Sequence, residues 1–153
     1  MKSRMGALCA SLLVVVGVVA CGEAEPIQNE DDIYQRAQMP DDVLPSHIAN
    51  RADAQDQDWD EKSSRLLASH AGHQFFLVRS AAQGNCLVTV DQAPPQPWVA
   101  ACSPSNRIGM SGPAGVRAEL DLEGFDDDVP PLEGWSRPVP ELQVLVPNGS
   151  DRP

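Results

Sequence analysis

Residues 75–102, FFLVRSAAQGNCLVTVDQAPPQPWVAAC, decide the fold of this chain. They contain three runs of apolar, β-branched and aromatic residues, the composition that favours strands. Gly84 and its polar neighbours separate the first two runs, and a loop with three prolines at 91–97 separates the last two. Short apolar runs between such turn residues predict neighbouring antiparallel strands.

A hairpin that places Cys86 opposite Cys102 fixes the register of the last two strands. Because strand side chains alternate between faces, Val88 then lies opposite Ala100 on a wholly apolar face. A disulfide between directly opposed residues suits a non-hydrogen-bonded pair, in which the Cα atoms approach to about 5.5 Å or less. The other pairs of this register are Leu87–Ala101, Thr89–Val99 and Val90–Trp98.

Further strand-like runs recur at short spacing on both sides of this stretch. No segment after residue 65 has a helical apolar period longer than two turns. We therefore predict one mainly β module over residues 65–146, built as a single small antiparallel sheet, a sandwich or a partly open barrel with one disulfide. An α+β fold is the alternative. The predicted strands are 65–68, 74–79, 86–90, 98–102, 107–110, 116–122 and 142–146.

The N-terminus has the pattern of an export signal. Lys2 and Arg4 precede an uncharged apolar run at 5–20. As a helix this run is about 24 Å long, shorter than the ~30 Å hydrocarbon core of a bilayer. Residues 1–20 therefore predict a cleaved secretory signal rather than a permanent membrane span.

The apolar run ends with Val18-Val19-Ala20-Cys21. This sequence resembles the bacterial lipobox, with Val18 in place of the commoner leucine. The resemblance implies that Cys21 receives a diacylglyceryl thioether and anchors the mature chain at the extracytoplasmic face of the cell membrane. Two acyl chains give stable anchoring, where one would be marginal. Ordinary cleavage that leaves Cys21 free, or an uncleaved helix, is the alternative.

The remaining cysteines follow from this assignment. Cys9 lies in the predicted signal and Cys21 takes lipid, which leaves Cys86 and Cys102. Two cysteines in an exported domain of this size most often form a disulfide, and a metal site would need two further ligands beside them. We therefore predict a Cys86–Cys102 disulfide and no metal.

Residues 21–64 are acidic and interrupted by prolines. Low hydrophobicity with high net charge leaves little apolar surface to offset the entropy of ordering. We predict a largely disordered spacer, with one or two short helices at 31–39 and 41–50; an acidic binding arm is the alternative. Residues 147–153 read as a polar tail.

The charge balance limits the partners of the chain. Its formal net charge is −11, and it becomes −13 without residues 1–20, which carry two basic residues and no acid. Such a surface repels nucleic-acid phosphates and anionic lipid headgroups. We therefore expect no nucleic-acid partner, and membrane contact through the acyl chains on Cys21 alone.

Several short motifs resemble those of small exported and lipid-anchored proteins of actinobacteria. The resemblance covers residues 62–147 and implies the β fold pattern and the disulfide. It brings no established activity and no catalytic residues. The motifs are R-L-L at 65–67, an aromatic strand, G-x-C-L-V at 84–88, W-x-x-x-C at 98–102, L-E-G-F-D at 122–126 and G-W at 134–135.

The residues with the most reactive side chains do not form a recognisable site. His70 and His73 are expected in an exposed turn rather than as half of a metal site. The acids between 121 and 128 lack the EF-hand pattern. Trp98 and Trp135 are expected in the core, with a binding surface as the alternative. Nucleophile-elbow, metalloprotease and phosphate-loop motifs do not occur in the sequence, so we assign no catalytic residue, metal or cofactor.

These observations predict a lipid-anchored envelope protein with a non-catalytic module that binds a protein or another envelope component. A small surface hydrolase or metal-dependent enzyme is the rival hypothesis, and an inhibitor or ligand-carrying lipoprotein is the third. A concave pocket with convergent polar groups would favour an enzyme or a carrier. A flat apolar patch would favour protein interaction.

Overall fold

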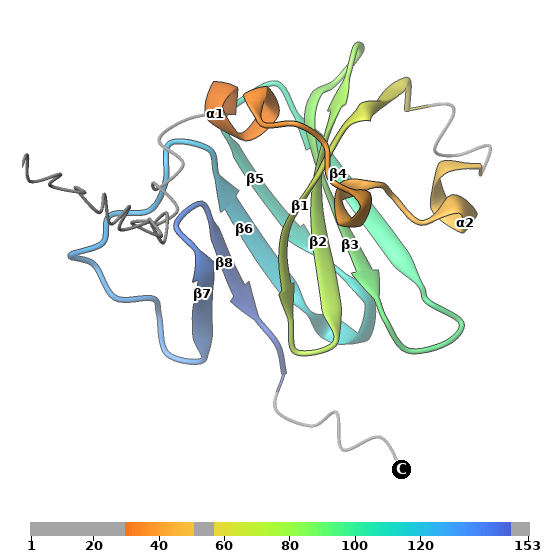
Figure 1. Cartoon of the computed structure of the whole chain (residues 1–153). Coiled ribbons are helices and arrows are strands. Elements are labelled where there is room, and N and C mark those ends of the chain that lie inside the picture. The colour runs from red at the N-terminus through yellow and green to blue at the C-terminus, as the bar shows by residue number, and fades with distance from the viewer. Residues whose placement is uncertain (1–29, 51–56, 148–153) are drawn as a thin grey trace, which may run out of the picture.

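The computed structural model describes residues 30–50 and 57–147. Its strands form two four-stranded antiparallel sheets (Figure 1). Sheet A has the order β1-β2-β3-β4, and sheet B has the order β5-β6-β8-β7. The strands are β1 (Trp59–His70), β2 (His73–Ser80), β3 (Gly84–Asp91), β4 (Trp98–Ser103), β5 (Arg107–Ser111), β6 (Arg117–Asp121), β7 (Trp135–Val139) and β8 (Leu142–Leu145).

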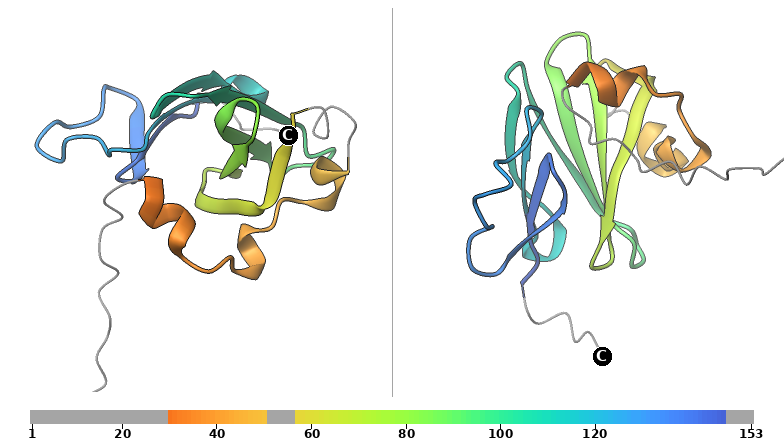
Figure 2. Two further views of the ribbon diagram at one scale, coloured as in Figure 1. Left: turned by 90° about the horizontal axis from the view of Figure 1, so that it is seen from above. Right: turned by 60° about the vertical axis from the view of Figure 1, so that its left-hand side comes forward.

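The helical elements are short. In residues 30–50 and 57–147, three of them precede sheet A and one connects β5 to β6. They are the α-helices α1 (Glu30–Gln35) and α2 (Ser46–Ala49), and the 3-10 helices η1 (Pro40–Asp42) and η2 (Pro113–Gly115). The mainly β prediction is confirmed, and the two sheets pack face to face as a sandwich (Figure 2).

An inner core fills the space between the two sheets. From sheet A it receives Phe75, Leu77 and Leu87, which alternate along β2 and β3 as strand geometry requires. Sheet B contributes aliphatic side chains at the same spacing. Those on its strands are Ile108, Ala118, Leu120, Leu142 and Val144.

The predicted register of the cysteine hairpin is confirmed. Cys86 pairs with Cys102 and Val88 with Ala100, and the other pairs of this hairpin are also those predicted. The two cysteine sulfurs form a disulfide, and their Cα atoms lie 4.0 Å apart, as in a non-hydrogen-bonded pair. The bond joins the terminal strand β4 to β3, and closing a loop of this length adds about 3 kcal/mol in the chain-entropy model.

Sheet A is also covered on the face that points away from sheet B. Phe76, Val78 and Val88 lie on this outer face and pack against Leu44 and Ile48. These two residues belong to the N-terminal segment, by which we mean residues 30–50. The wholly apolar face of the hairpin therefore meets residues 40–50, while the alternate face meets sheet B. Seen from above, residues 40–50, sheet A and sheet B form three successive layers (Figure 2).

The spacer prediction for 21–64 is wrong for the part that the structure describes. Ile33, Leu44 and Ile48 are between 0% and 3% exposed, and β1 begins at Trp59 rather than at residue 65. Few apolar residues are enough to order this segment, because each of them packs into a core that is built mainly by the sheets. Short helices do occur near the predicted positions. Residues 1–29, 51–56 and 148–153, including the predicted signal and Cys21, lie outside the described residues.

Strand β7 was missed by the sequence prediction. It contains Pro138, which argues against a central strand, and it occupies the end of sheet B where such a residue is tolerated. Its pairing with β8 also shifts register between Ser136 and Val139. Because of the proline and the irregular pairing, the sequence of β7 lacks the regular alternation of apolar and polar residues that identifies a strand.

Candidate functional site

A groove of about 620 Å³ runs beside the terminal strand β4. Its residues come from α2, the position just before β1, the β2–β3 turn, the loop before β4 and β4 itself. We call it the β4 groove. It is lined by His47, Gln57, Gln83, Pro95, Gln96, Pro97, Trp98, Val99, Ala100 and Cys102.

Trp98 supplies the largest apolar surface in the groove. It is half-buried, and its ring meets the ring of Trp59 edge to face, with 5.9 Å between the centroids. Both rings pack against the apolar cluster on the outer face of sheet A, which contains Leu44 and Ile48. The aromatic wall of the groove is thus positioned by the N-terminal segment as well as by the sheet.

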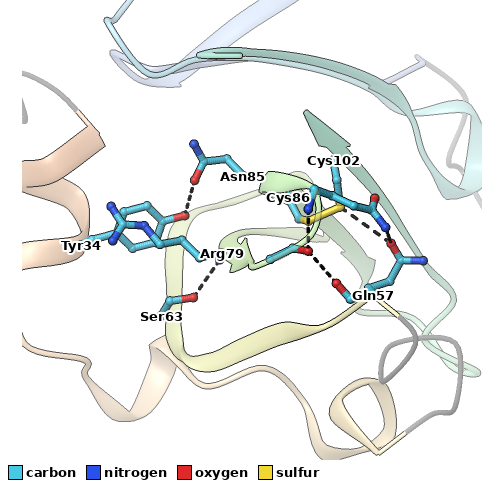
Figure 3. The surroundings of a disulfide bond; sticks show 9 residues. Tyr34, Gln57, Ser63, Arg79, Asn85, Cys86 and Cys102 are labelled. Carbon is cyan, nitrogen blue, oxygen red and sulfur yellow. Dashed lines mark hydrogen bonds between the residues drawn. A yellow bond between two sulfur atoms is a disulfide. The ribbon is translucent and has the colours of Figure 1, made fainter. Parts of the chain in front are cut away.

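Gln57 fixes the polar end of the groove next to the disulfide (Figure 3). Its main-chain oxygen accepts a hydrogen bond of 2.6 Å from Ser80 Oγ, and its Oε1 accepts one of 2.8 Å from Gln83 Nε2. The same Oε1 lies 4.0 Å from Cys102 Sγ. These contacts leave the amide of Gln57 oriented before any ligand arrives.

The loop before β4 forms the other end of the groove. The Asp91 N–H donates to Pro97 O at 2.9 Å, and the Gln96 N–H donates to Ala93 O at 2.8 Å. Asp91 Oδ1 accepts a further bond from the Ala93 N–H. Three hydrogen bonds therefore hold the seven-residue loop 91–97 in one conformation, and this loop forms the rim of the β4 groove.

The lining of the β4 groove has a simple electrostatic character. Among the described residues that line it, His47 is the single ionisable side chain apart from the disulfide-bonded Cys102, and the remaining groups are amides, prolines, aliphatic side chains and an indole. These described residues accommodate uncharged polar and apolar groups, and none of their side chains is placed as a nucleophile next to a base. Chemically, the arrangement suits binding.

His70 and His73 depart from the exposed turn that the sequence predicted. His73 is 6% exposed, and its ring lies 6.4 Å from that of Phe75 at the edge of the inner core. His70 Nε2 lies 2.8 Å from Ser136 Oγ. This contact connects β1 to β7, the terminal strands of sheets A and B. The turn between them has only two residues, Ala71 and Gly72, which carries His73 straight into β2.

The acids near residue 121 are engaged separately. Asp121 is buried and bonds Arg107 at 2.7 Å, while its other oxygen accepts the Glu123 N–H. Asp126 Oδ1 accepts the Asp128 N–H. Within residues 30–50 and 57–147, no three His, Cys, Asp or Glu side chains are placed to hold a metal ion.

The two predicted aromatic candidates lie on different sheets. Trp98 is in β4 of sheet A, and Trp135 is in β7 of sheet B, where it lines a smaller hollow of about 360 Å³. Both are half-buried rather than fully buried. The sequence missed Trp59, because it lies in the acidic segment that was assigned to the spacer.

Residues of the N-terminal segment close the outer edge of β1. Arg36 and Asp42 form a bidentate ion pair, with 2.8 Å between Nη2 and Oδ1. The Leu66 N–H donates to Asp42 Oδ1, and Leu66 O accepts from Arg36 Nη2. Gln38 Nε2 caps the oxygen of Ser64 in the same way. The ion pair therefore takes the place that a neighbouring strand would occupy.

The same contacts hold the pKa of Asp42 below its ordinary value of 3.8. Burial acts in the opposite direction and is the largest single influence. It is outweighed by the Arg36 side chain together with the main-chain N–H groups of Met39 and Leu66. The charged form is thus favoured by folding, so its stabilisation is present above pH 3.8 and is lost as pH falls through the lowered pKa.

Glu141 is a buried carboxyl away from the β4 groove. It is 1% exposed, and its Oε1 has no hydrogen-bond partner. Burial raises the pKa of Glu141, and its own main-chain N–H only partly offsets this effect. The neutral form is favoured by folding, so Glu141 destabilises the fold progressively as pH rises above 4.5.

Comparisons with protein-family models, with curated protein sequences and with solved structures give no match for this chain. The resemblance to actinobacterial lipoproteins therefore stays a prediction. Within the described residues, no helix is both long and apolar enough to cross a membrane.

Asp42→Asn tests the closure of the β1 edge. At neutral pH the free energy of unfolding of the variant is expected to be about 2 kcal/mol lower than that of the wild type. The reason is that the charge-assisted hydrogen bonds to the main chain of Leu66 and Met39 are weakened. The deficit should shrink as the pH falls from 3.8 through the lowered pKa of Asp42, because the wild-type carboxyl then becomes neutral as well. Urea unfolding at a series of pH values measures both effects. Exposed Asp41→Asn is the matched control, and an equal response from the two variants would contradict the account.

Proposed function

We propose that this chain is a lipid-anchored protein of the bacterial cell envelope, and that its β sandwich binds a partner without catalysing a reaction. The observation that supports it best is the β4 groove. Its volume of about 620 Å³ lies within the range of about 300–1,000 Å³ that is usual for binding sites. The indole, aliphatic side chains and amides among its described residues offer contact area and hydrogen-bonding groups, as expected of a site that holds a ligand.

The position of the folded part supports a partner close to the membrane. Residues 22–29 separate the proposed lipidated Cys21 from α1. Even fully extended, eight residues reach at most about 29 Å. The anchor would therefore keep the sandwich near the lipid surface, instead of extending it outward on a spacer of some forty residues.

A ligand-carrying lipoprotein is the second candidate, because the same groove could enclose part of a small molecule. The two functions differ in what touches the groove rim in the cell. A binding module holds a protein there for long enough to be cross-linked. A carrier leaves the rim in contact with solvent and a small ligand.

Cys21→Ala tests the anchor. We expect the wild-type chain to sediment with membranes and the variant to appear mainly in the soluble fraction, because the thioether that carries the acyl chains cannot form. Immunoblotting of both fractions measures the distribution. Cys9→Ala, within the predicted signal, is the control and should stay with the membrane. A variant at position 21 that remains membrane-bound would overturn the anchoring proposal.

Photo-cross-linking tests binding at the groove. The photoreactive residue p-benzoylphenylalanine is placed at Gln83, which is exposed and lines the β4 groove, or at Glu123, which is exposed in the turn after β6. Irradiation of intact cells should give a discrete protein adduct from position 83 and none from position 123. The adduct is read as a band shift. Equal adducts from both positions, or none from position 83, would contradict the proposed binding site.

A further inference from the structure

We propose that the outer edge of β4 pairs with an extended, positively charged peptide segment of a partner protein, which adds a fifth strand to sheet A. This inference rests on the proposed function, since it identifies the kind of partner that the β4 groove accepts.

The register of the hairpin decides which main-chain groups point outward. Cys86 and Cys102 are a non-hydrogen-bonded pair with Cα atoms 4.0 Å apart, so the next pair, Leu87 with Ala101, is hydrogen-bonded. Along β4 the direction alternates. The N–H and C=O groups of Ala101 therefore face β3, and those of Ala100 and Cys102 face away from the sheet.

These outward groups have no partner in the described part of the chain. No strand of residues 30–50 and 57–147 pairs with the outer edge of β4, and no hydrogen bond joins the main chain of Ala100 or Cys102 to a loop or side chain there. The same residues line the β4 groove. Main-chain donors and acceptors that face outward beside a groove, as at Ala100 and Cys102, are the arrangement used in β-strand addition.

The other terminal strands are protected against such pairing. Side chains of Arg36 and Asp42 occupy the edge of β1 at Leu66. Strand β7 contains Pro138 and an irregular register. Strand β5 has only five residues and begins with the exposed Arg107. Proline, charge, irregular pairing and short length are the usual devices that prevent edge pairing.

Strand β4 carries none of these devices. Its sequence WVAACS has no charge and no proline, and its pairing with β3 is continuous over all six residues. The disulfide also holds this edge to β3, so it is rigid before a partner arrives. An extended peptide could therefore form main-chain hydrogen bonds with β4, while the groove supplies contacts for its alternate side chains.

Charge favours a basic peptide over a second copy of this chain. The chain carries a net charge of −11, and Asp58 and Asp60 are exposed beside Gln57 at one end of the groove. Two such chains would repel one another, whereas a peptide with lysine or arginine would be attracted at long range. The indole, aliphatic side chains and amides that line the groove then suit its apolar and small polar side chains.

Selection from a phage-displayed library of random linear nine-residue peptides tests the inference on the purified chain. We expect the enriched peptides to be basic, and their dissociation constants to be measurable by fluorescence anisotropy. Ala100→Pro should weaken binding about tenfold or more, because proline removes one outward N–H and leaves its partner unpaired. Ala100→Ser, which keeps that N–H, should bind within about threefold of the wild type. Melting temperatures establish that both variants are folded.

A second arm needs no variant of the protein. N-methylation of the selected peptide at alternate amides should abolish binding in one phase, where the amides face β4, and leave it nearly unchanged in the other. Failure to enrich any peptide, enrichment of acidic peptides, or equal tolerance of both methylation phases would overturn the inference. A concentration-dependent dimer that Ala100→Pro abolishes would also overturn it, in favour of a second copy. A Gln83 cross-link together with any of these results would leave the binding function standing.

Discussion

The structure depends on one constraint, which is that the central strands β2 and β3 are apolar on both faces. Phe75 and Leu77 point toward sheet B, and Phe76 and Val78 point the opposite way. Each face must be removed from water, because a fully exposed row of such side chains would cost several kcal/mol. Sheet B covers the first face, and residues 40–50 cover the second (Figure 2). The acidic N-terminal segment is therefore a layer of the fold.

The fold could be predicted from the sequence where the signals were local. Alternation and turn residues identified the strands, and the cysteine pair gave the register of β3 and β4 to the residue. The parts that failed depend on distant partners. Asp42 looks like a solvated acid until Arg36 and the main chain of Leu66 are placed beside it. Strand β7 is hidden by Pro138, and His73 is buried because Phe75 follows it into the core.

The candidate site was harder to predict than the fold. The sequence offered Trp98 and Trp135 as a pair, yet Trp98 packs on Trp59 instead. The β4 groove gathers described residues from four separate parts of the chain, and its main-chain groups cannot be recognised from side-chain identity. What the sequence did contain was the register, from which the outward groups of Ala100 follow once β4 is known to end the sheet. Within the described residues, side chains of Arg36 and Asp42 close the β1 edge of sheet A, whereas no strand pairs with its β4 edge.

The most direct test of the central claim is the stability of Ile48→Ala compared with that of Val43→Ala. Ile48 is fully buried against the outer face of sheet A, whereas Val43, five residues earlier, is 55% exposed. If residues 40–50 are a layer of the fold, urea unfolding followed by the circular dichroism of the sheets should show a loss of about 2–5 kcal/mol for Ile48→Ala. Val43→Ala should change the unfolding free energy by less than about 0.5 kcal/mol. Equal and small effects from both variants would contradict the account and return this segment to the role of a spacer.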